Sequence, residues 1–357
     1  MRSLVALAGI SAVLLVSACG RDAPKDAAQS SAPQASAAVD AAALQARAAA
    51  MFQVIPAEMR TERYPLTEAR VTLGRILYYD PRLSRNRDIS CKSCHDLAKY
   101  GVDGKPTSNG DKGQPGGRNS PTTYNAALHI AQFWDGRAAD VEAQAKGPIL
   151  NPVEMAMPDA DAVVKTLKSI PGYAELFQAA FPDDKDPINY DNVGMAIGAF
   201  ERKLVTPAPF DRFIAGDLTA LNEAQLTGFN TFVNSGCASC HNGVGAGGGM
   251  YQKLGLVKAF ETTDTGRAEV TKNEADKFFF KVPSLRNIAQ TGPYFHDGKV
   301  TTLDDAIRLM AEHQVGKALT DQEVSEIRAF LGSLTGTLPA DYIAKPALPG
   351  VGPATGT

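Results

Sequence analysis

The chain has 357 residues, of which 44% are hydrophobic and 21% are charged, and its formal net charge is −3 at pH 7. This slightly acidic balance argues against a nucleic-acid-binding protein, which would carry a basic excess. Beyond the first segments, about 300 residues remain, which is enough for two domains.

The chain begins with the features of an export signal. Arg2 precedes a mostly apolar run from Leu4 to Val16, which is too short to span a bilayer as a helix. The run ends in Val-Ser-Ala-Cys, which resembles a lipoprotein processing site, so we expect residues 1–18 to be removed and Cys19 to carry lipid. Ordinary cleavage nearby is the alternative. Gly20 favours the outer membrane, and the protein is expected in the periplasm.

A composition rich in Ala, Ser, Gln and Pro follows the signal and indicates a flexible linker over residues 19–47, with a weak helix near Ala41–Ala50. We expect an N-terminal domain over residues 48–206, a C-terminal domain over residues 207–345, and a tail over residues 346–357.

Helical periodicity recurs along the folded part, whereas strand signals are few. The best strand candidate is Phe278–Val282, and Gly- and Pro-rich loops such as Gly101–Pro121 fill much of the remainder. A capping box from Thr320 to Glu323 opens the last helix. The predicted helices cover residues 66–79, 159–170, 173–181, 190–204, 222–234, 302–312 and 320–334.

Two of these helices lead into the same pentapeptide pattern. Cys91-Lys92-Ser93-Cys94-His95 recurs as Cys237-Ala238-Ser239-Cys240-His241. In this pattern two thiols attach a haem covalently, and the following imidazole ligates its iron. A zinc site shared by both pairs would bridge far more residues than usual, and a thioredoxin-like motif needs no histidine after both pairs.

The two patterns therefore predict two covalently bound haem c groups, with His95 and His241 as iron ligands. The fold is expected to be mainly α, with two cytochrome c-like domains that each hold one haem, long loops and few short strands.

The second haem has an evident candidate for its other iron ligand. Met310 lies 69 residues after His241, near the end of its domain, as in Met-ligated cytochromes. Met310 could instead be a core residue, because it shares a helix face with other apolar residues. His313 and Met250 are the competing ligands.

From about Met51 to Pro339 the chain resembles the bacterial di-haem cytochrome c peroxidases, with both haem motifs in register. The matching segments are Gly101–Gly104, Asn119–Thr122, Phe133–Arg137, Gln144, Pro152–Met155, Asp264–Arg267, Pro293–His296 and Met310.

The resemblance implies an enzyme that reduces hydrogen peroxide to water with electrons from a small cytochrome c or a copper protein. It implies that Glu154 moves protons with the help of the Gln144 amide, which fits the need of peroxide cleavage for a base. It also places Trp134 between the haems as an electron bridge. By residue pattern alone, Glu154 could be a solvated loop carboxylate and Trp134 a filler of the domain interface.

Two further properties are implied by the resemblance alone. One is a calcium ion bound by Asn119, Thr291 and Pro293, whose oxygen ligands suit that cation. The other is a homodimeric assembly.

The chain departs from the family pattern at Asp111, where most members have a histidine that closes the resting first haem. No histidine occurs between His95 and His129. We therefore expect the first haem to be open or water-bound in the oxidised protein, unless Lys112 or Met157 takes the site.

Two other function classes share these motifs. An electron-carrying di-haem cytochrome would need a strong ligand on both faces of both irons, and an evident one exists only for the second haem. In a di-haem enzyme that oxidises protein residues, a tyrosine replaces the methionine ligand, and Met310 argues against that class.

Overall fold

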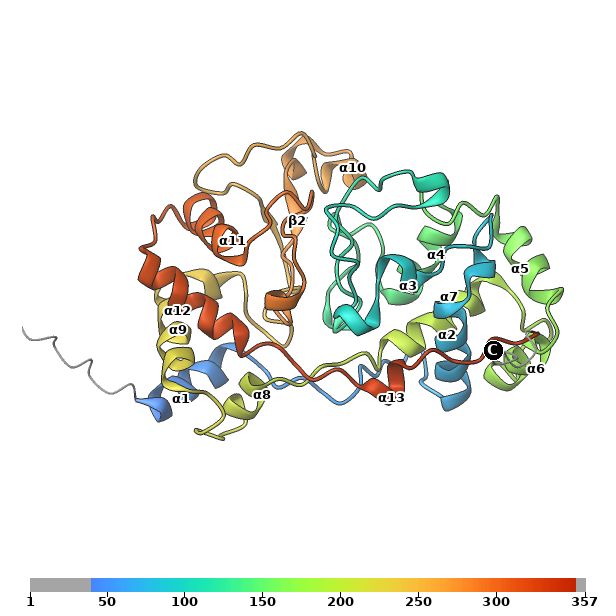
Figure 1. Cartoon of the computed structure of the whole chain (residues 1–357), viewed down its shortest axis with the longest axis horizontal. Coiled ribbons are helices and arrows are strands. Elements are labelled where there is room, and N and C mark those ends of the chain that lie inside the picture. The colour runs from blue at the N-terminus through green and yellow to red at the C-terminus, as the bar shows by residue number, and fades with distance from the viewer. Residues whose placement is uncertain (1–39, 351–357) are drawn as a thin grey trace, which may run out of the picture. The chain divides into compact units, whose positions relative to one another are not determined.

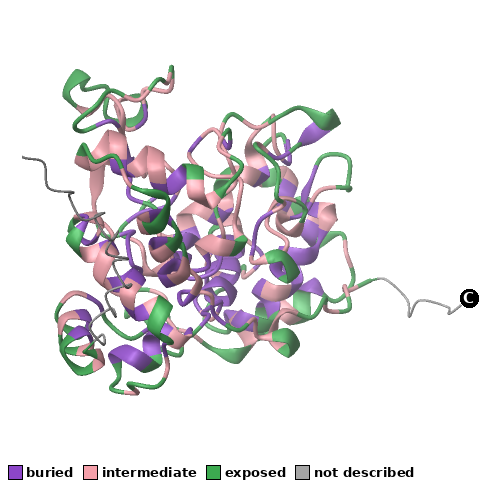
Figure 2. Cartoon of the chain, turned by 60° about the vertical axis from the view of Figure 1, so that its left-hand side comes forward, coloured by how far each residue is buried: buried purple, intermediate pink, exposed green. Residues whose placement is uncertain are grey.

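The computed structural model describes residues 40–350 (Figure 1). The predicted export signal, Cys19 and most of the predicted linker lie outside the described residues. Within residues 40–350, no helix is both long enough and apolar enough to cross a membrane. The fold is mainly helical, as predicted, and buried side chains form two separate hydrophobic clusters. Figure 2 marks the buried residues along the chain.

The first cluster is built around α2 (Glu68–Tyr79) and α7 (Tyr190–Glu201). The Thr67 hydroxyl caps α2 by accepting a hydrogen bond from the Arg70 amide. The two helices approach closely at Gly74, where a Cβ atom would lie 1.8 Å from the Ala196 carbonyl oxygen. The remaining helices of this lobe are α3 (Cys91–Cys94), α4 (Val141–Leu150), α5 (Ala160–Lys168) and α6 (Tyr173–Ala180).

The second cluster repeats this arrangement around α9 (Glu223–Asn234) and α12 (Asp321–Gly332). At Gly228 a Cβ atom would lie 1.9 Å from the Glu326 carbonyl oxygen, so this pair also packs through a glycine. The predicted capping box of Thr320 and Glu323 is confirmed. The other helices of this lobe are α8 (Pro209–Ile214), α10 (Ala268–Thr271) and α11 (Leu303–Met310). Helix α11 continues as a π-helical turn over Ala311–Val315.

A single two-stranded antiparallel sheet lies within the described part of the chain. It pairs β1 (Tyr251–Lys253) with β2 (Phe279–Lys281), with Tyr251 opposite Lys281. The strand predicted at residues 278–282 is confirmed, one residue shorter at each end. Short 3-10 turns occupy Pro81–Leu83, Leu97–Lys99, Asp111–Gly113, Ala126–Leu128, Cys237–Ser239, Glu274–Asp276 and Ile288–Gln290.

The weak helix predicted near Ala41–Ala50 is confirmed, and the chain is packed at both ends of the described residues. Residues 41–47, assigned to the linker, begin α1 (Ala41–Met51), which packs against α8 and α9 (Figure 1). The reason is an apolar stripe of Leu44, Ala48 and Phe52, which enters the second cluster although these residues precede the first haem motif. At the other end, α13 (Ala340–Ile343) packs against the first cluster, and so does Leu348, which falls in the predicted tail.

Candidate active site and haem-binding residues

The first haem motif presents its histidine in a fixed orientation. α3 places Cys91 and Cys94 one turn apart, and the His95 amide donates to the Cys91 carbonyl at 2.9 Å. Tyr78 Oη donates to the His95 carbonyl at 2.8 Å, and the His95 Nδ1 lies 3.3 Å from the Gly101 carbonyl. Burial lowers the pKa of His95, which keeps the ring neutral. A neutral ring held through Nδ1 leaves Nε2 free for iron, so this segment fits a haem.

The second motif has the same local design. The His241 amide donates to the Cys237 carbonyl at 3.1 Å. Burial lowers the pKa of His241 to about 4. Its Nδ1 is buried without a well-aligned hydrogen-bond partner, although the Ala246 and Pro283 backbones lie beside it. These features fit an imidazole that awaits a metal on its other nitrogen.

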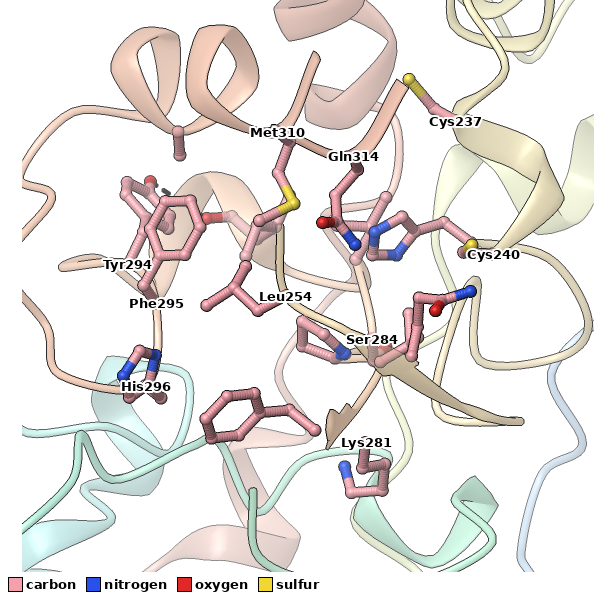
Figure 3. Close-up of a pocket in the computed structure, with 18 of the residues that line it drawn as sticks. Cys237, Cys240, Leu254, Lys281, Ser284, Tyr294, Phe295, His296, Met310 and Gln314 are labelled. Atoms are coloured by element: carbon pink, nitrogen blue, oxygen red, sulfur yellow. Dashed lines mark hydrogen bonds between the residues drawn. The ribbon is translucent and has the colours of Figure 1, made fainter. Parts of the chain in front are cut away.

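A mostly apolar cavity surrounds the second motif, and Met310 reaches it from the last turn of α11 (Figure 3). Neither competing ligand lines this cavity. His313 instead places its Nδ1 2.9 Å from the Lys258 carbonyl. The arrangement therefore favours Met310 as the sulfur ligand. The apolar lining includes Phe232, Leu254, Leu256, Leu285, Ile288, Leu303, Ile307 and Leu331.

The same cavity extends to the loops that hold the first histidine. Its lining includes Val102 and Pro121, next to the segments that face the His95 ring. Trp134 also lines the cavity, and its Nε1 donates to the Asn119 carbonyl at 2.9 Å. The structure thus places the only tryptophan between the two haem-binding segments.

An ion-pair network holds the loop that carries Trp134. Arg118 pairs with Asp135 at 2.5 Å and with Asp264 at 2.6 Å. Although burial opposes the charge on Arg118, its hydrogen bonds to Asp264 and Asp135 raise the pKa of the guanidinium. Arg267 also donates to the Asp135 carbonyl at 3.1 Å. Asp135 is 2% exposed, so the network fixes the tryptophan loop against the other lobe.

A second cavity lies beside Glu154, at the end of the segment that follows α4. Burial raises the pKa of Glu154, while Arg137 and a hydrogen bond from Asn151 act in the opposite direction. Burial is the main cause of the raised pKa of the Cys94 thiol, and the charge of nearby Glu154 adds to it. The lining consists of Phe133, Arg137, Ala138, Ala143, Gly147, Pro148, Asn151 and Glu154.

Gln144 is not among the residues that line this cavity. It is half-buried in α4, one turn before Gly147 and Pro148, which do line it. The structure therefore brings Glu154 to the first haem motif and leaves Gln144 one helical turn away.

The loop around Asp111 packs directly on the Glu154 segment. At Gly110 a Cβ atom would lie 1.9 Å from the Val153 carbonyl oxygen, and the Asp111 amide donates to the Glu154 carbonyl at 2.8 Å. The Asp111 side chain is 3% exposed and accepts a hydrogen bond from Asn86 Nδ2 at 2.6 Å. Of the two rival ligands, Lys112 is exposed and Met157 is packed in the first cluster.

Comparison with known proteins agrees with this geometry. Residues 68–219 match the model of the di-haem cytochrome c peroxidase family. The chain is 45% identical to a cytochrome c551 peroxidase of Pseudomonas aeruginosa over 85% of its own length and 90% of the relative's. The chain belongs to the di-haem cytochrome c peroxidase family.

Other relatives of this peroxidase show how broad the family is. The chain is 48% identical to a cytochrome c551 peroxidase of Nitrosomonas europaea, over 75% of this chain and 80% of the relative. It is 39% identical to a methylamine utilization protein MauG of Methylorubrum extorquens, over 74% of each chain. A solved MauG-like protein associated with microbial copper homeostasis matches with a TM-score of 0.72 and 27% identity, over 82% of this chain and 97% of that one.

The three residues suggested for calcium all line the cavity that Trp134 shares with the second haem motif. Asn119 Nδ2 donates to the Lys105 and Pro106 carbonyls at 3.0 and 3.2 Å, which leaves its Oδ1 for another partner. Within residues 40–350, no three His, Cys, Asp or Glu side chains gather as a metal site. A cation in this peroxidase would depend on amide and backbone oxygens.

Sequence reasoning missed several polar residues of this peroxidase that the structure places at the two sites. Lys281 lines the larger cavity, and Arg118 bonds to Asp264 beside it. Gln314 joins the π-helical turn to the loop after β1 by hydrogen bonds. None of these residues belongs to a motif with regular spacing. Only their burial and their contacts across the chain identify them.

Proposed function

We propose that this peroxidase reduces peroxide on the Glu154 side of the Cys91–His95 segment and receives electrons at the segment of Cys237, Cys240, His241 and Met310. Haems held at these residues would supply the one-electron redox chemistry. The observation that carries this assignment is the difference between the two cavities. One contains a thioether in an apolar lining, whereas the other contains a carboxylate.

Glu154 moves the protons of the reaction. The overall change consumes one hydrogen peroxide, two electrons and two protons and yields two waters. Glu154 takes the proton from one peroxide oxygen and returns it to the other oxygen as water leaves. Its raised pKa supports this role, since a carboxylate that is a stronger base than usual is also a usable acid near neutral pH. Gln144 assists from the preceding helical turn through its amide.

Trp134 provides the path between the two sites. Two observations support this role: Trp134 lines the shared cavity, and its indole donates a hydrogen bond to the Asn119 carbonyl. The donor is a small cytochrome c, as the family name implies, or a copper protein.

The first iron site is proposed to be open in the fully oxidised protein. The Asp111 side chain is buried against Asn86, Lys112 is exposed and Met157 belongs to the core, so none of the three is offered to iron. An electron-spin spectrum of the as-isolated ferric protein tests this idea. Two purely low-spin haems would contradict it, whereas a high-spin component is expected.

Three assembly features remain proposals. We propose a periplasmic protein attached to the outer membrane by lipid on Cys19, a calcium ion at Asn119, Thr291 and Pro293, and a homodimer. Mass spectrometry of the native N-terminus, calcium analysis after dialysis, and sedimentation velocity test these proposals separately.

The decisive assay for the site assignment is steady-state turnover of hydrogen peroxide with a reduced cytochrome c. Comparing the protein with and without prior reduction also shows whether an activation step exists. A protein that exchanges electrons but leaves peroxide unreacted would be a carrier and would refute the proposal.

A further inference from the structure

Lys281 and His129 form an isolated pair of polar groups beside the second haem motif. Lys281, the last residue of β2, is 7% exposed, and its Nζ lies 3.2 Å from His129 Nδ1. Within residues 40–350 this ammonium makes no ion pair with a carboxylate. The Nε2 of His129 is buried and has no hydrogen-bond partner. Burying an ammonium without an anion is costly, so this arrangement calls for a missing acceptor.

The hydrogen positions follow from the chemistry of the pair. Burial lowers the pKa of His129 well below its usual value, and Lys281 acts in the same direction, so the ring is neutral. Because Lys281 Nζ can only donate, His129 Nδ1 must accept, and the ring hydrogen resides on Nε2. The pair therefore presents one imidazole N–H and the remaining ammonium N–H groups, all of them donors.

Both residues line the cavity that surrounds Cys237, Cys240 and Met310, which is otherwise mainly apolar. Figure 3 shows Lys281 at the rim of this cavity near Ser284, on the side away from Met310. The position of the pair is fixed by the backbone. The Lys281 amide donates to the Trp134 carbonyl at 2.8 Å, and a Cβ atom on Gly248 would lie 2.2 Å from the His129 ring.

We propose that Lys281 and His129 form a carboxylate-binding subsite for a propionate of the haem attached at Cys237 and Cys240. A haem carries two such carboxylates, and in this cavity they are the acceptors that the pair lacks. The inference rests on the proposed attachment of a haem at this motif. It adds that the carboxylate edge of that haem faces the Trp134 loop, because the Lys281 backbone is bonded to that loop.

Two properties of the bound haem follow from this contact. The ammonium holds one carboxylate in its ionised form and in one orientation. A fixed positive charge near the iron also favours the ferrous over the ferric state. Removing that charge therefore lowers the reduction potential of the Met310-ligated haem.

The test uses the full holoprotein with carbon-13 in the haem carboxylates. Lys281→Met is compared with Lys281→Arg, which keeps the charge, and with Lys253→Met. Lys253 is an exposed residue of β1, the strand paired with β2, so its substitution removes the same charge in solvent. Mass spectrometry first confirms haem on Cys237 and Cys240, and a redox titration and an oxidised-minus-reduced infrared spectrum follow.

We expect Lys281→Met to shift a labelled carboxylate band and to lower the potential, while Lys253→Met leaves both near their original values. Unchanged labelled bands in a haem-loaded Lys281→Met protein would overturn the proposal, and would indicate that the pair binds another anion or none. If that variant fails to fold, a crystal structure of the native holoprotein decides. A haem carboxylate beyond 4 Å from both Lys281 Nζ and His129 Nε2 would refute the contact. Absence of haem from this motif would instead refute the site assignment on which the proposal rests.

Discussion

Replacing Glu154 with glutamine tests the proton-transfer role most directly. The substitution keeps the size and hydrogen-bonding ability of the side chain but removes its basicity. Of the residues that line the cavity beside Glu154, Arg137 is the only other charged one, and a guanidinium offers donors but no acceptor for a proton. No neighbour can therefore take over as the base.

The expected loss follows from that isolation. General acid–base catalysis by one positioned group contributes ~10²–10⁴-fold, which corresponds to about 2.7–5.4 kcal/mol of transition-state stabilisation. We expect Glu154→Gln to lower kcat/KM for hydrogen peroxide within this range. Electron uptake by the haem proposed at Cys237 and Cys240 should proceed as in the native protein. Steady-state peroxide assays and stopped-flow reduction measure the two quantities.

The pH dependence provides an internal check on the same residue. Because burial raises the pKa of Glu154, the acid limb of kcat/KM should lie above the usual range of a glutamate. Arg137 lowers this pKa, so Arg137→Gln should move the limb to higher pH. A pH–rate profile that is the same in the native protein and in the Arg137 variant would contradict the assignment.

Stability should change in the opposite direction from activity. When folding raises the pKa of a carboxyl, that group stabilises the native state most below its unfolded pKa. This stabilisation is lost as the pH rises through the folded pKa, because the buried carboxyl must then ionise. Glu154→Gln removes this cost, so the Tm should rise at pH 7 and stay the same near pH 4. Glu175→Gln, an exposed residue of α6, serves as the control. A Tm of Glu154→Gln that did not rise at pH 7, or that rose equally in Glu175→Gln, would refute the reasoning.

Three further substitutions test the surroundings of the two sites. Trp134→Phe should slow electron transfer between the two proposed haem sites and leave both haem spectra intact. An unchanged single-turnover rate would argue against a bridging role. Arg118→Met leaves the buried Asp135 with only Arg137 as an ion-pair partner. Chemical denaturation should then show a loss of about 3–5 kcal/mol in the free energy of unfolding. A loss below ~1 kcal/mol would show that the network contributes little. Gln314→Leu should broaden or weaken the methionine–iron absorption of the ferric protein, and an unaltered spectrum would exclude a positioning role for that amide.

The local parts of this architecture could be predicted from the sequence. Each haem motif is a contiguous pattern, and α2, α9 and α12 carry a strong apolar periodicity together with a cap. The sequence also predicts the N-terminal helix, but not its packing, because the stripe of Leu44, Ala48 and Phe52 is set in alanine-rich surroundings. Its partner surface is formed by residues more than 150 positions later, as the bond from Gln45 Nε2 to the Ile214 carbonyl shows.

The polar parts of the sites could not be predicted from the residues alone. Arg118 and Asp264 are 146 residues apart, and His129 and Lys281 are 152 apart. No spacing rule joins such pairs, and each of these residue types is usually found on a solvated surface. The resemblance to a family suggested Glu154, whereas the buried Lys281 became informative only when its lack of a counterion was visible.

The difference between the two sites arises in loops attached to a duplicated helical frame. Both lobes pack the helix before the haem motif through a glycine against a later helix, so the frame alone would produce equivalent haem pockets. In the second lobe, Gln314 Oε1 accepts from the Gly255 and Leu256 amides at 2.6 and 3.1 Å, which ties the π-helical turn after Met310 to the loop that covers the cavity. In the first lobe, the Asp111 loop instead contacts the Glu154 segment through backbone atoms. The loops, rather than the shared helical frame, thus place a thioether in one cavity and a carboxylate in the other.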